Sequence, residues 1–191
     1  VISKRNDGHH NLETTFQLIN LFDEISFEES DKSFGISCDG LDIEPENNLI
    51  FKSLNAITKY CNVDKGIQIH LKKIIPAGAG LGGGSSNAAT TLIALNKIWD
   101  LNLSTEELVD IGKGLGADVP IFIYGKNAVA TGIGDVLSDI KFKKNKYFLI
   151  YPDIEVSTSE MFGKLKIHEL DPKHQNSFLD TLLKEYKSIE E

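Results

Sequence analysis

The sequence is poor in cysteine, has no long apolar segment and carries no excess of positive charge. Its two cysteines, Cys38 and Cys61, show neither a CxxC pair nor metal-ligand spacing, which argues against a disulfide framework or a zinc site and suits a reducing cytoplasm. No apolar run approaches the length of a membrane span, and no signal peptide is visible. The formal net charge of −8 argues against a nucleic-acid partner, because phosphate backbones are bound by clustered lysine and arginine. We therefore expect a cytoplasmic protein that binds neither a membrane nor a nucleic acid.

The chain of 191 residues, 41% hydrophobic and 25% charged, has the composition of an ordinary globular protein. The basic segment 141–146, KFKKNK, is typical of a connector between domains. We therefore expect a first domain over residues 1–145 and the start of a second over 146–191. The second stretch is too short for a core of its own, and Val1 is not an initiator methionine, so we expect further sequence at both ends.

The most distinctive stretch is 76–91, PAGAGLGGGSSNAATT. Five glycines fall within seven residues, directly before two serines and an asparagine: Gly78, Gly80, Gly82, Gly83 and Gly84. Glycine tolerates positive φ and leaves backbone N–H groups free to converge on an anion. Ser86 and Asn87 are good N-cap residues, and the apolar spacing after them predicts a helix with one buried face, made of Ala88, Leu92, Leu95 and Trp99. A glycine-rich loop that enters a helix N-terminus predicts a site for phosphate, and hence for a nucleotide.

Three other interpretations of this stretch are weaker. It has no Gly-Lys-Ser/Thr ending and no lysine inside it, so it is not a Walker A loop. Gly80, Gly82 and Gly84 match a dinucleotide fingerprint only in part, because Ser85 stands where the last glycine should be. A flexible Gly/Ser linker would not run directly into an amphipathic helix with an N-cap signal.

Apolar periodicity predicts further elements along the chain. Alternation predicts strands at 25–27, 34–38 and 67–71, and short apolar runs predict strands at 121–124, 128–131 and 147–151. The apolar residues of 16–22 predict either a strand or a buried run. Helical spacing predicts helices from Asn48 to about Tyr60, after a capping box of Ser104 and Glu107, and around 178–183. A turn at Lys126-Asn127 would join the strands at 121–124 and 128–131 into a hairpin.

Two polar positions have both a structural and a functional interpretation. Asp118 lies at the expected junction of a helix with the strand 121–124, where an aspartate is most often a cap or turn former. Its place after the phosphate loop favours a catalytic role instead. His9 and His10 follow the turn signal at 6–8; neighbouring histidine side chains diverge and no third ligand is in view, so a polar loop is more common than a metal site. A pocket-lining role for one of them stays open.

Four ordered motifs together resemble the GHMP family of small-molecule kinases: DGHHNLET at 7–14, NNLI at 47–50, PAGAGLGGGSSNAAT at 76–90 and LGADVP at 115–120. They cover roughly the first three-quarters of the chain, which makes a chance match a poor explanation. The resemblance implies an α+β fold, with a mixed-sheet N-terminal domain and an incomplete ferredoxin-like C-terminal domain. It also implies ATP-dependent phosphoryl transfer, with Mg²⁺, to a hydroxyl of a CDP-linked methylerythritol substrate, by a monomer or weak homodimer.

The resemblance also assigns roles to individual residues. The ATP phosphates would be held by the loop and the helix start: Pro76, Gly78, Gly80, Leu81, Gly82, Gly83, Gly84, Ser85, Ser86 and Asn87. Asn48 and Lys73 match residues at the adenine pocket, and Ser85 or Ser86 would reach Mg²⁺, with no dedicated metal ligand assigned. His10, with His9 beside it, matches the histidine that recognises the cytosine ring. Asp118 matches the aspartate that takes the proton from the acceptor hydroxyl.

Three departures from the family pattern matter. The family begins with a strand that carries a PAKLN-type motif, whose lysine is the other catalytic group, and this chain starts after it. His9 stands where the family usually has tyrosine, and the C-terminal stretch is short. Two alternatives stay open: a GHMP kinase that acts on another alcohol, such as homoserine or a mevalonate-type substrate, and a nucleotide-binding module that is catalytically incomplete.

Overall fold

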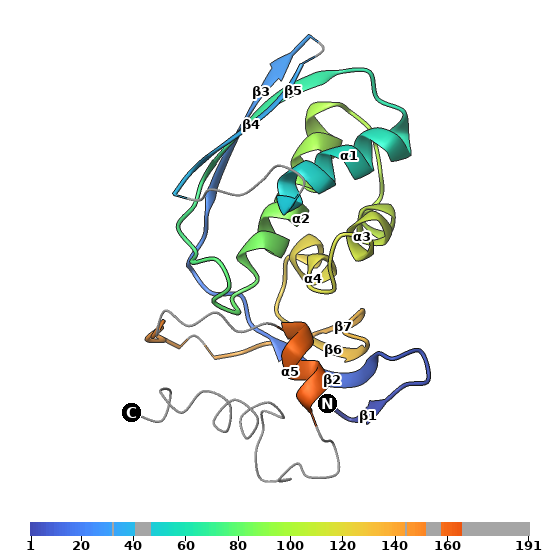
Figure 1. Ribbon diagram of the computed structural model, residues 1–191, viewed down its shortest axis with the longest axis vertical. Helices are drawn as coiled ribbons and strands as arrows, with labels where there is room; N and C mark the ends of the chain where they lie inside the picture. The colour runs from blue at the N-terminus through green and yellow to red at the C-terminus, as the bar shows by residue number, and fades with distance from the viewer. Residues whose placement is uncertain (32, 41–46, 144, 152–157, 166–191) are drawn as a thin grey trace.

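The computed structural model describes residues 1–31, 33–40, 47–143, 145–151 and 158–165 (Figure 1). Within these residues the strands are β1 (Ser3–Lys4), β2 (His10–Phe16), β3 (Glu24–Ser30), β4 (Phe34–Asp39), β5 (Gly66–Lys72), β6 (Ala128–Gly132) and β7 (Val136–Asp139). The helices are α1 (Leu49–Cys61), α2 (Gly83–Ile98), α3 (Thr105–Lys113), α4 (Val119–Tyr124) and α5 (Thr158–Lys164).

One sheet has the strand order β3-β5-β4 and packs against the helices. The central strand β5 is antiparallel to β3 and parallel to β4, so the sheet is mixed. Alternate residues of β5, which are Ile67, Ile69 and Leu71, are buried in the same core cluster as the inner faces of α1 and α2. Figure 1 shows both helices on one side of this sheet. The strands expected at 25–27, 34–38 and 67–71 are therefore confirmed.

A second sheet has the order β1-β2-β6-β7, and its neighbouring strands are all antiparallel. Its central pair joins distant parts of the sequence, since Leu12 of β2 lies opposite Gly132 of β6. Figure 1 shows this sheet at the end of the molecule that carries the N-terminus, next to α5. The strand expected at 128–131 is confirmed as β6.

The two longest helices form as their sequences predict. The side chain of Asn48 accepts the N–H of Ile50 at 2.9 Å and so caps α1. The expected inner face of α2 is buried along its whole length, from Ala88 to Trp99. The capping box of α3 is also present, because Ser104 and Glu107 exchange both of their expected hydrogen bonds. No helix among the described residues is long and apolar enough to cross a membrane.

The strand expected at 121–124 is wrong, because these residues belong to α4. Pro120 lies in the first turn of this helix, and Gly125, with φ of +70°, ends it. Proline suits the first turn of a helix and glycine the residue after its end, so the order of residues carried a helix signal. Packing against α2 and α3 decides for the helix. The hairpin expected at Lys126-Asn127 is therefore also wrong, since that pair joins a helix to β6.

Two other apolar runs do not form the expected strands. β2 ends at Phe16, and residues 17–23 have an irregular backbone that leaves Leu18 exposed. Residues 147–151 have no regular structure, and Phe148 is fully exposed. An apolar run forms a strand only where a neighbour completes its hydrogen bonds, and none of the described strands pairs with either run. The helix expected near 178–183 lies outside the described residues, and the domain division after residue 145 stays a prediction.

Candidate active site around the glycine-rich loop

Residues 76–82 connect β5 to α2 and are called the glycine-rich loop below. Gly78, Gly80 and Gly82 have φ of +72°, +69° and +67°, a conformation that other residues adopt only with strain. Gly82 is the N-cap residue of α2, and the helix begins at Gly83. The N-cap expected at Ser86 or Asn87 is therefore wrong. The left-handed glycine turns the chain into the helix earlier, and the N–H of Ser86 already donates to the carbonyl of Gly82 at 2.8 Å.

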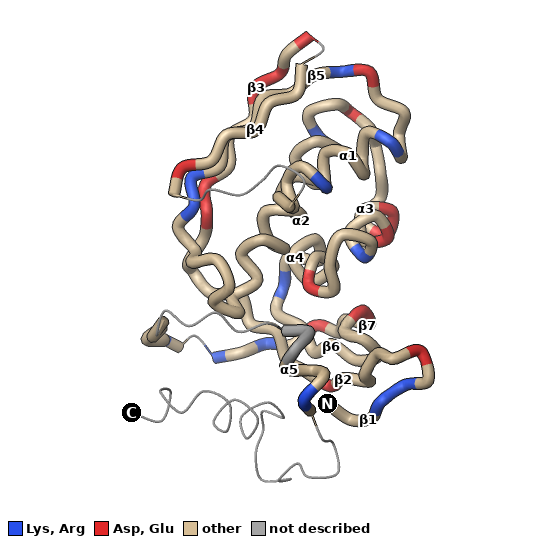
Figure 2. The backbone as a smooth tube through the Cα atoms, in the orientation of Figure 1, with Lys and Arg blue, Asp and Glu red and all other residues tan. Residues whose placement is uncertain are grey.

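The glycine-rich loop itself contains no charged side chain. No charged residue occurs between Lys73 and Lys97, and Figure 2 shows the tube uncharged over the loop and the first turns of α2. The first N–H groups of a helix have no partner inside the helix, and its dipole places partial positive charge at the same end. The start of α2 can therefore hold a phosphate without a lysine in the loop.

Helix α4 packs directly against the glycine-rich loop. A Cβ atom on Gly82 would lie 2.8 Å from Cε2 and Cζ of Phe122, so the Phe122 ring occupies the space beside this glycine. A Cβ atom on Gly116 would lie 3.8 Å from Oγ of Ser85, which places the turn before α4 beside the first turn of α2. Nothing in the local sequence identifies Phe122 as a neighbour of the loop, because the contact depends on how two helices pack.

Asp118 immediately precedes α4 and occupies its N-cap position, yet its side chain makes no capping hydrogen bond. Solvent reaches this side chain, but the surrounding protein removes enough water to raise the pKa of Asp118 above its ordinary value. The geometry therefore does not support the interpretation of Asp118 as a simple cap. A carboxylate with a raised pKa, next to the turn that contacts the start of α2, is suited to accept a proton.

Lys73 lies at the exit of β5, beside the helix start and away from solvent. Its Nζ atom is 2.5 Å from Oδ2 of Asp23, and the two side chains are 7% and 1% exposed. A Cβ atom on Gly83 would lie 3.0 Å from this Nζ, so the ammonium group is next to the first residue of α2. The lysine predicted to border the adenine pocket is thus engaged in an internal ion pair. Asp23 was missed by sequence reasoning, because an aspartate ahead of a strand carries no signal of its distant partner.

Asn48 lies near the same helix start from the side of α1. Its Oδ1 atom is already used as the cap of that helix. The next residue, Leu49, has its Cδ1 atom 3.3 Å from where a Cβ on Gly84 would lie, so the N-termini of α1 and α2 are neighbours. The structure therefore brings Asn48, Lys73 and the loop residues to one region. A contact of Asn48 with adenine stays a prediction.

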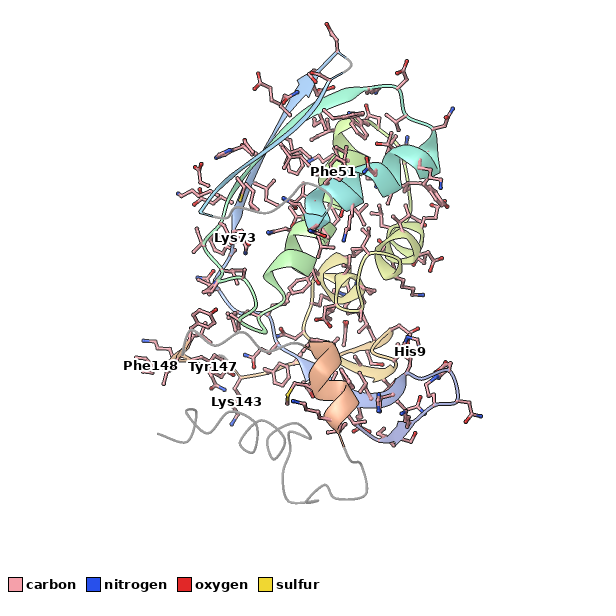
Figure 3. The ribbon with its side chains drawn as sticks, viewed as in Figure 1. His9, Phe51, Lys73, Lys143, Tyr147 and Phe148 are labelled. Carbon is pink, nitrogen blue, oxygen red and sulfur yellow. The ribbon has the colours of Figure 1, made fainter. Side chains whose placement is uncertain are left out.

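His9 and His10 lie in a different part of the molecule, at the start of β2. Figure 3 shows His9 on the opposite side from Lys73. His9 is exposed, whereas the His10 ring packs on Phe162 of α5, with centroids 5.2 Å apart and planes 31° apart. Partial burial, followed by repulsion from Lys4, the N-terminal amine and His9, lowers the pKa of His10. Sequence reasoning missed Phe162, because the two rings are far apart in the sequence.

A metal site was expected only through the bound nucleotide. Among the described residues, no group of three or more histidine, cysteine, aspartate or glutamate side chains could hold a metal ion. Ser85 and Ser86, the residues predicted to reach Mg²⁺, both lie in the first turn of α2. At the start of α2, the candidate metal ligands among the described residues are therefore hydroxyl groups and not a cluster of carboxylates.

Two comparisons agree on the class of protein to which this fold belongs, the GHMP kinases. A family model described as the GHMP kinases N terminal domain matches residues 48–126, which include the glycine-rich loop and Asp118. A solved structure titled "Crystal structure of 4-(cytidine 5'-diphospho)-2C-methyl-D-erythritol kinase" superposes with a TM-score of 0.81 at 25% identity, over 98% of this chain and 74% of that one.

Two curated relatives identify the branch of the GHMP kinase family to which this chain belongs. A 4-diphosphocytidyl-2-C-methyl-D-erythritol kinase from Acinetobacter baylyi is 44% identical over 166 residues, which are 86% of this chain and 60% of the relative. One of the same name from Acinetobacter baumannii is 39% identical over all of this chain and 73% of its own length. The chain belongs to the 4-diphosphocytidyl-2-C-methyl-D-erythritol kinases of the GHMP kinase family. It spans only 60% of the length of the first of these relatives.

Proposed function

We propose that this chain carries the nucleotide site of a kinase that transfers a phosphoryl group from ATP to the 2-hydroxyl of 4-diphosphocytidyl-2-C-methyl-D-erythritol, a step of non-mevalonate isoprenoid biosynthesis. The observation that carries the proposal is the packing of α4 against the glycine-rich loop. It brings the turn that ends at Asp118 beside Ser85, at the helix start suited to phosphate. A cytoplasmic location and a monomeric or weakly dimeric state stay predictions from the sequence.

In this proposal the ATP phosphates lie on the loop and the first turn of α2, from Gly80 to Ser86. The unpaired N–H groups and the helix dipole offset the charge of the polyphosphate. Mg²⁺ would be held chiefly by phosphate oxygens, with a hydroxyl of Ser85 or Ser86 as the protein ligand, because Mg²⁺ commonly keeps substrate phosphates and water in its coordination shell. The bound ion would offset the negative charge of the phosphates during transfer.

Asp118 acts as the general base in this scheme. The acceptor hydroxyl oxygen attacks the γ-phosphorus, the bond to the bridging oxygen breaks, ADP leaves, and the Asp118 carboxylate takes the hydroxyl proton. Phosphoryl transfer depends more on position and charge than on covalent chemistry, so the part of Asp118 is to orient the hydroxyl and to accept its proton. The raised pKa of Asp118 brings its proton affinity closer to that of a useful base.

The cytidine end of the substrate would be recognised at His10. A lowered pKa keeps the imidazole neutral near pH 7, with one nitrogen as donor and the other as acceptor, which suits the hydrogen-bonding edge of cytosine. Phe162 supplies an aromatic face beside it. His9, which stands where the family usually has tyrosine, is exposed and contributes less surface.

The test has a binding part and a transfer part. A slowly hydrolysed ATP analogue is titrated into this chain by calorimetry, and transfer is measured in the full-length protein with three acceptors: the CDP-linked methylerythritol, homoserine and mevalonate. We expect nucleotide binding, and transfer to the CDP-linked acceptor alone. Equal transfer to homoserine or mevalonate would refute the proposed acceptor. An absence of nucleotide binding would refute the proposed nucleotide site.

A further inference from the structure

We propose that Asp23 is a positioning residue that holds the glycine-rich loop in its binding conformation and thereby sets the affinity for ATP. The effect on ATP affinity rests on the proposed function. Asp23 lies in the irregular segment just before β3, far in sequence from the loop. Its side chain is 1% exposed, and an aspartate is rarely buried to this extent unless it is paired, as Asp23 is with Lys73. The role assigned above to Asp118 leaves this buried carboxylate unexplained.

Asp23 lies beside both ends of the connection between β5 and α2. Its Oδ1 atom accepts the N–H groups of Ile74 and Ile75, each at 2.7 Å, and its Oδ2 atom pairs with Lys73. These three residues lead directly into the loop. The side chain of Asn87, in the first turns of α2, is near enough to Asp23 to lower its pKa. One carboxylate therefore holds the chain before residues 76–82 and lies beside the helix that follows them.

These contacts keep Asp23 ionised. Burial alone would raise its pKa, but hydrogen bonds from Lys73 and from the N–H groups of Ile75 and Ile74, together with the nearby Asn87 side chain, outweigh it and lower the pKa of Asp23. A buried carboxylate that already accepts three hydrogen bonds, from Lys73, Ile74 and Ile75, is poorly suited to proton transfer or metal binding. Its physical effect is to hold the backbone that surrounds it.

The glycine-rich loop needs such a constraint. Glycines at positive φ lose more conformational freedom on ordering than other residues, so a free loop would have to be ordered whenever the nucleotide bound. The Asp23 contacts order the loop in advance. They also hold the ammonium group of Lys73 beside Gly83. The helix dipole is positive at this end and repels an ammonium group, and the negative charge of Asp23 offsets that repulsion.

The chain contains a matched control one residue further along. Glu24 of β3 pairs with Lys72 of β5 at 3.3 Å, with side chains 58% and 56% exposed. The two pairs lie one residue apart at the same ends of β3 and β5 and share their chemistry, but they differ in burial. An exposed pair contributes little to stability, whereas removing one partner of a buried pair leaves an uncompensated charge.

The experiment compares Asp23→Asn with Glu24→Gln in this chain. Amide hydrogen exchange of residues 76–86 is followed by mass spectrometry without nucleotide, and ATP affinity is measured by calorimetry at a temperature where circular dichroism shows both variants folded. We expect Asp23→Asn to exchange faster in the loop, with exchange in α1 unchanged, and to bind ATP about 10- to 100-fold more weakly. Glu24→Gln should match the wild type in both measurements.

A purely structural role would lower the melting temperature of Asp23→Asn and leave both loop exchange and ATP affinity at wild-type values, and that result overturns the proposal. If Asp23→Asn does not fold, the double variant Asp23→Ala/Lys73→Met removes both charges and so leaves no buried ion unpaired. Its loop should still exchange faster, and wild-type exchange there refutes the constraint. A wild-type chain that binds no ATP refutes the proposed function, while the exchange comparison still decides the role of Asp23.

Discussion

Replacing Gly82 by alanine tests the packing of α4 against the glycine-rich loop. An alanine in the left-handed conformation of Gly82, at φ of +67°, costs about 1–2 kcal/mol. Its Cβ would also lie 2.8 Å from the Phe122 ring, and overpacking of this kind adds about 1–3 kcal/mol. We therefore expect Gly82→Ala to lower the free energy of unfolding by about 2–5 kcal/mol.

Gly80 provides a control that separates the two contributions. It has nearly the same φ, +69°, but a Cβ on it would meet nothing within 4 Å. Gly80→Ala should therefore cost only the backbone strain, about 1–2 kcal/mol. Adding Phe122→Leu to Gly82→Ala should recover part of the packing cost, since the smaller side chain leaves room for the methyl group.

The assay is urea denaturation followed by circular dichroism, with the slope m compared among variants so that a change in the midpoint reports stability. Equal losses in Gly80→Ala and Gly82→Ala would show that Phe122 does not confine the loop. A loss below about 0.5 kcal/mol in both variants would contradict the left-handed conformation of these glycines.

Three further outcomes are expected. In the full-length protein, Asp118→Asn should slow phosphoryl transfer by about 10²–10⁴-fold with ATP affinity unchanged. Because loss of surrounding water raises the pKa of Asp118 above its ordinary value of 3.8, the wild-type rate should fall as the pH decreases through that raised pKa. A single-turnover pH profile of both proteins checks the two expectations. His10→Ala should weaken the CDP-linked substrate by about 1–3 kcal/mol in calorimetry and spare ATP, whereas equal weakening of both ligands would contradict the cytosine assignment. Ser104→Ala should lower the unfolding free energy by about 0.5–2 kcal/mol by removing the α3 cap, and an unchanged urea midpoint would contradict that cap.

Elements whose signals are local could be predicted from the sequence. The inner face of α2, from Ala88 to Trp99, follows from spacing of apolar residues at the helical period, and the cap of α1 at Asn48 follows from the chemistry of one side chain. The glycine-rich loop was recognisable for the same reason, because positive φ is a property of glycine itself. Each of these depends on neighbours within about one or two helical turns.

Other features were decided only by the tertiary structure. Residues 121–124 are apolar enough for a strand or a buried helix, and contact with α2 and α3 selected the helix. The pairing of Lys73 with Asp23 and of His10 with Phe162 joins residues about 50 and 150 positions apart, and no local pattern encodes such distances. The sequence by itself therefore determined that a glycine-rich loop with positive φ leads into a helix, because these properties depend on local residues. The tertiary structure decided that Asp23 and the Phe122 ring lie beside this loop, because long-range packing brings them there.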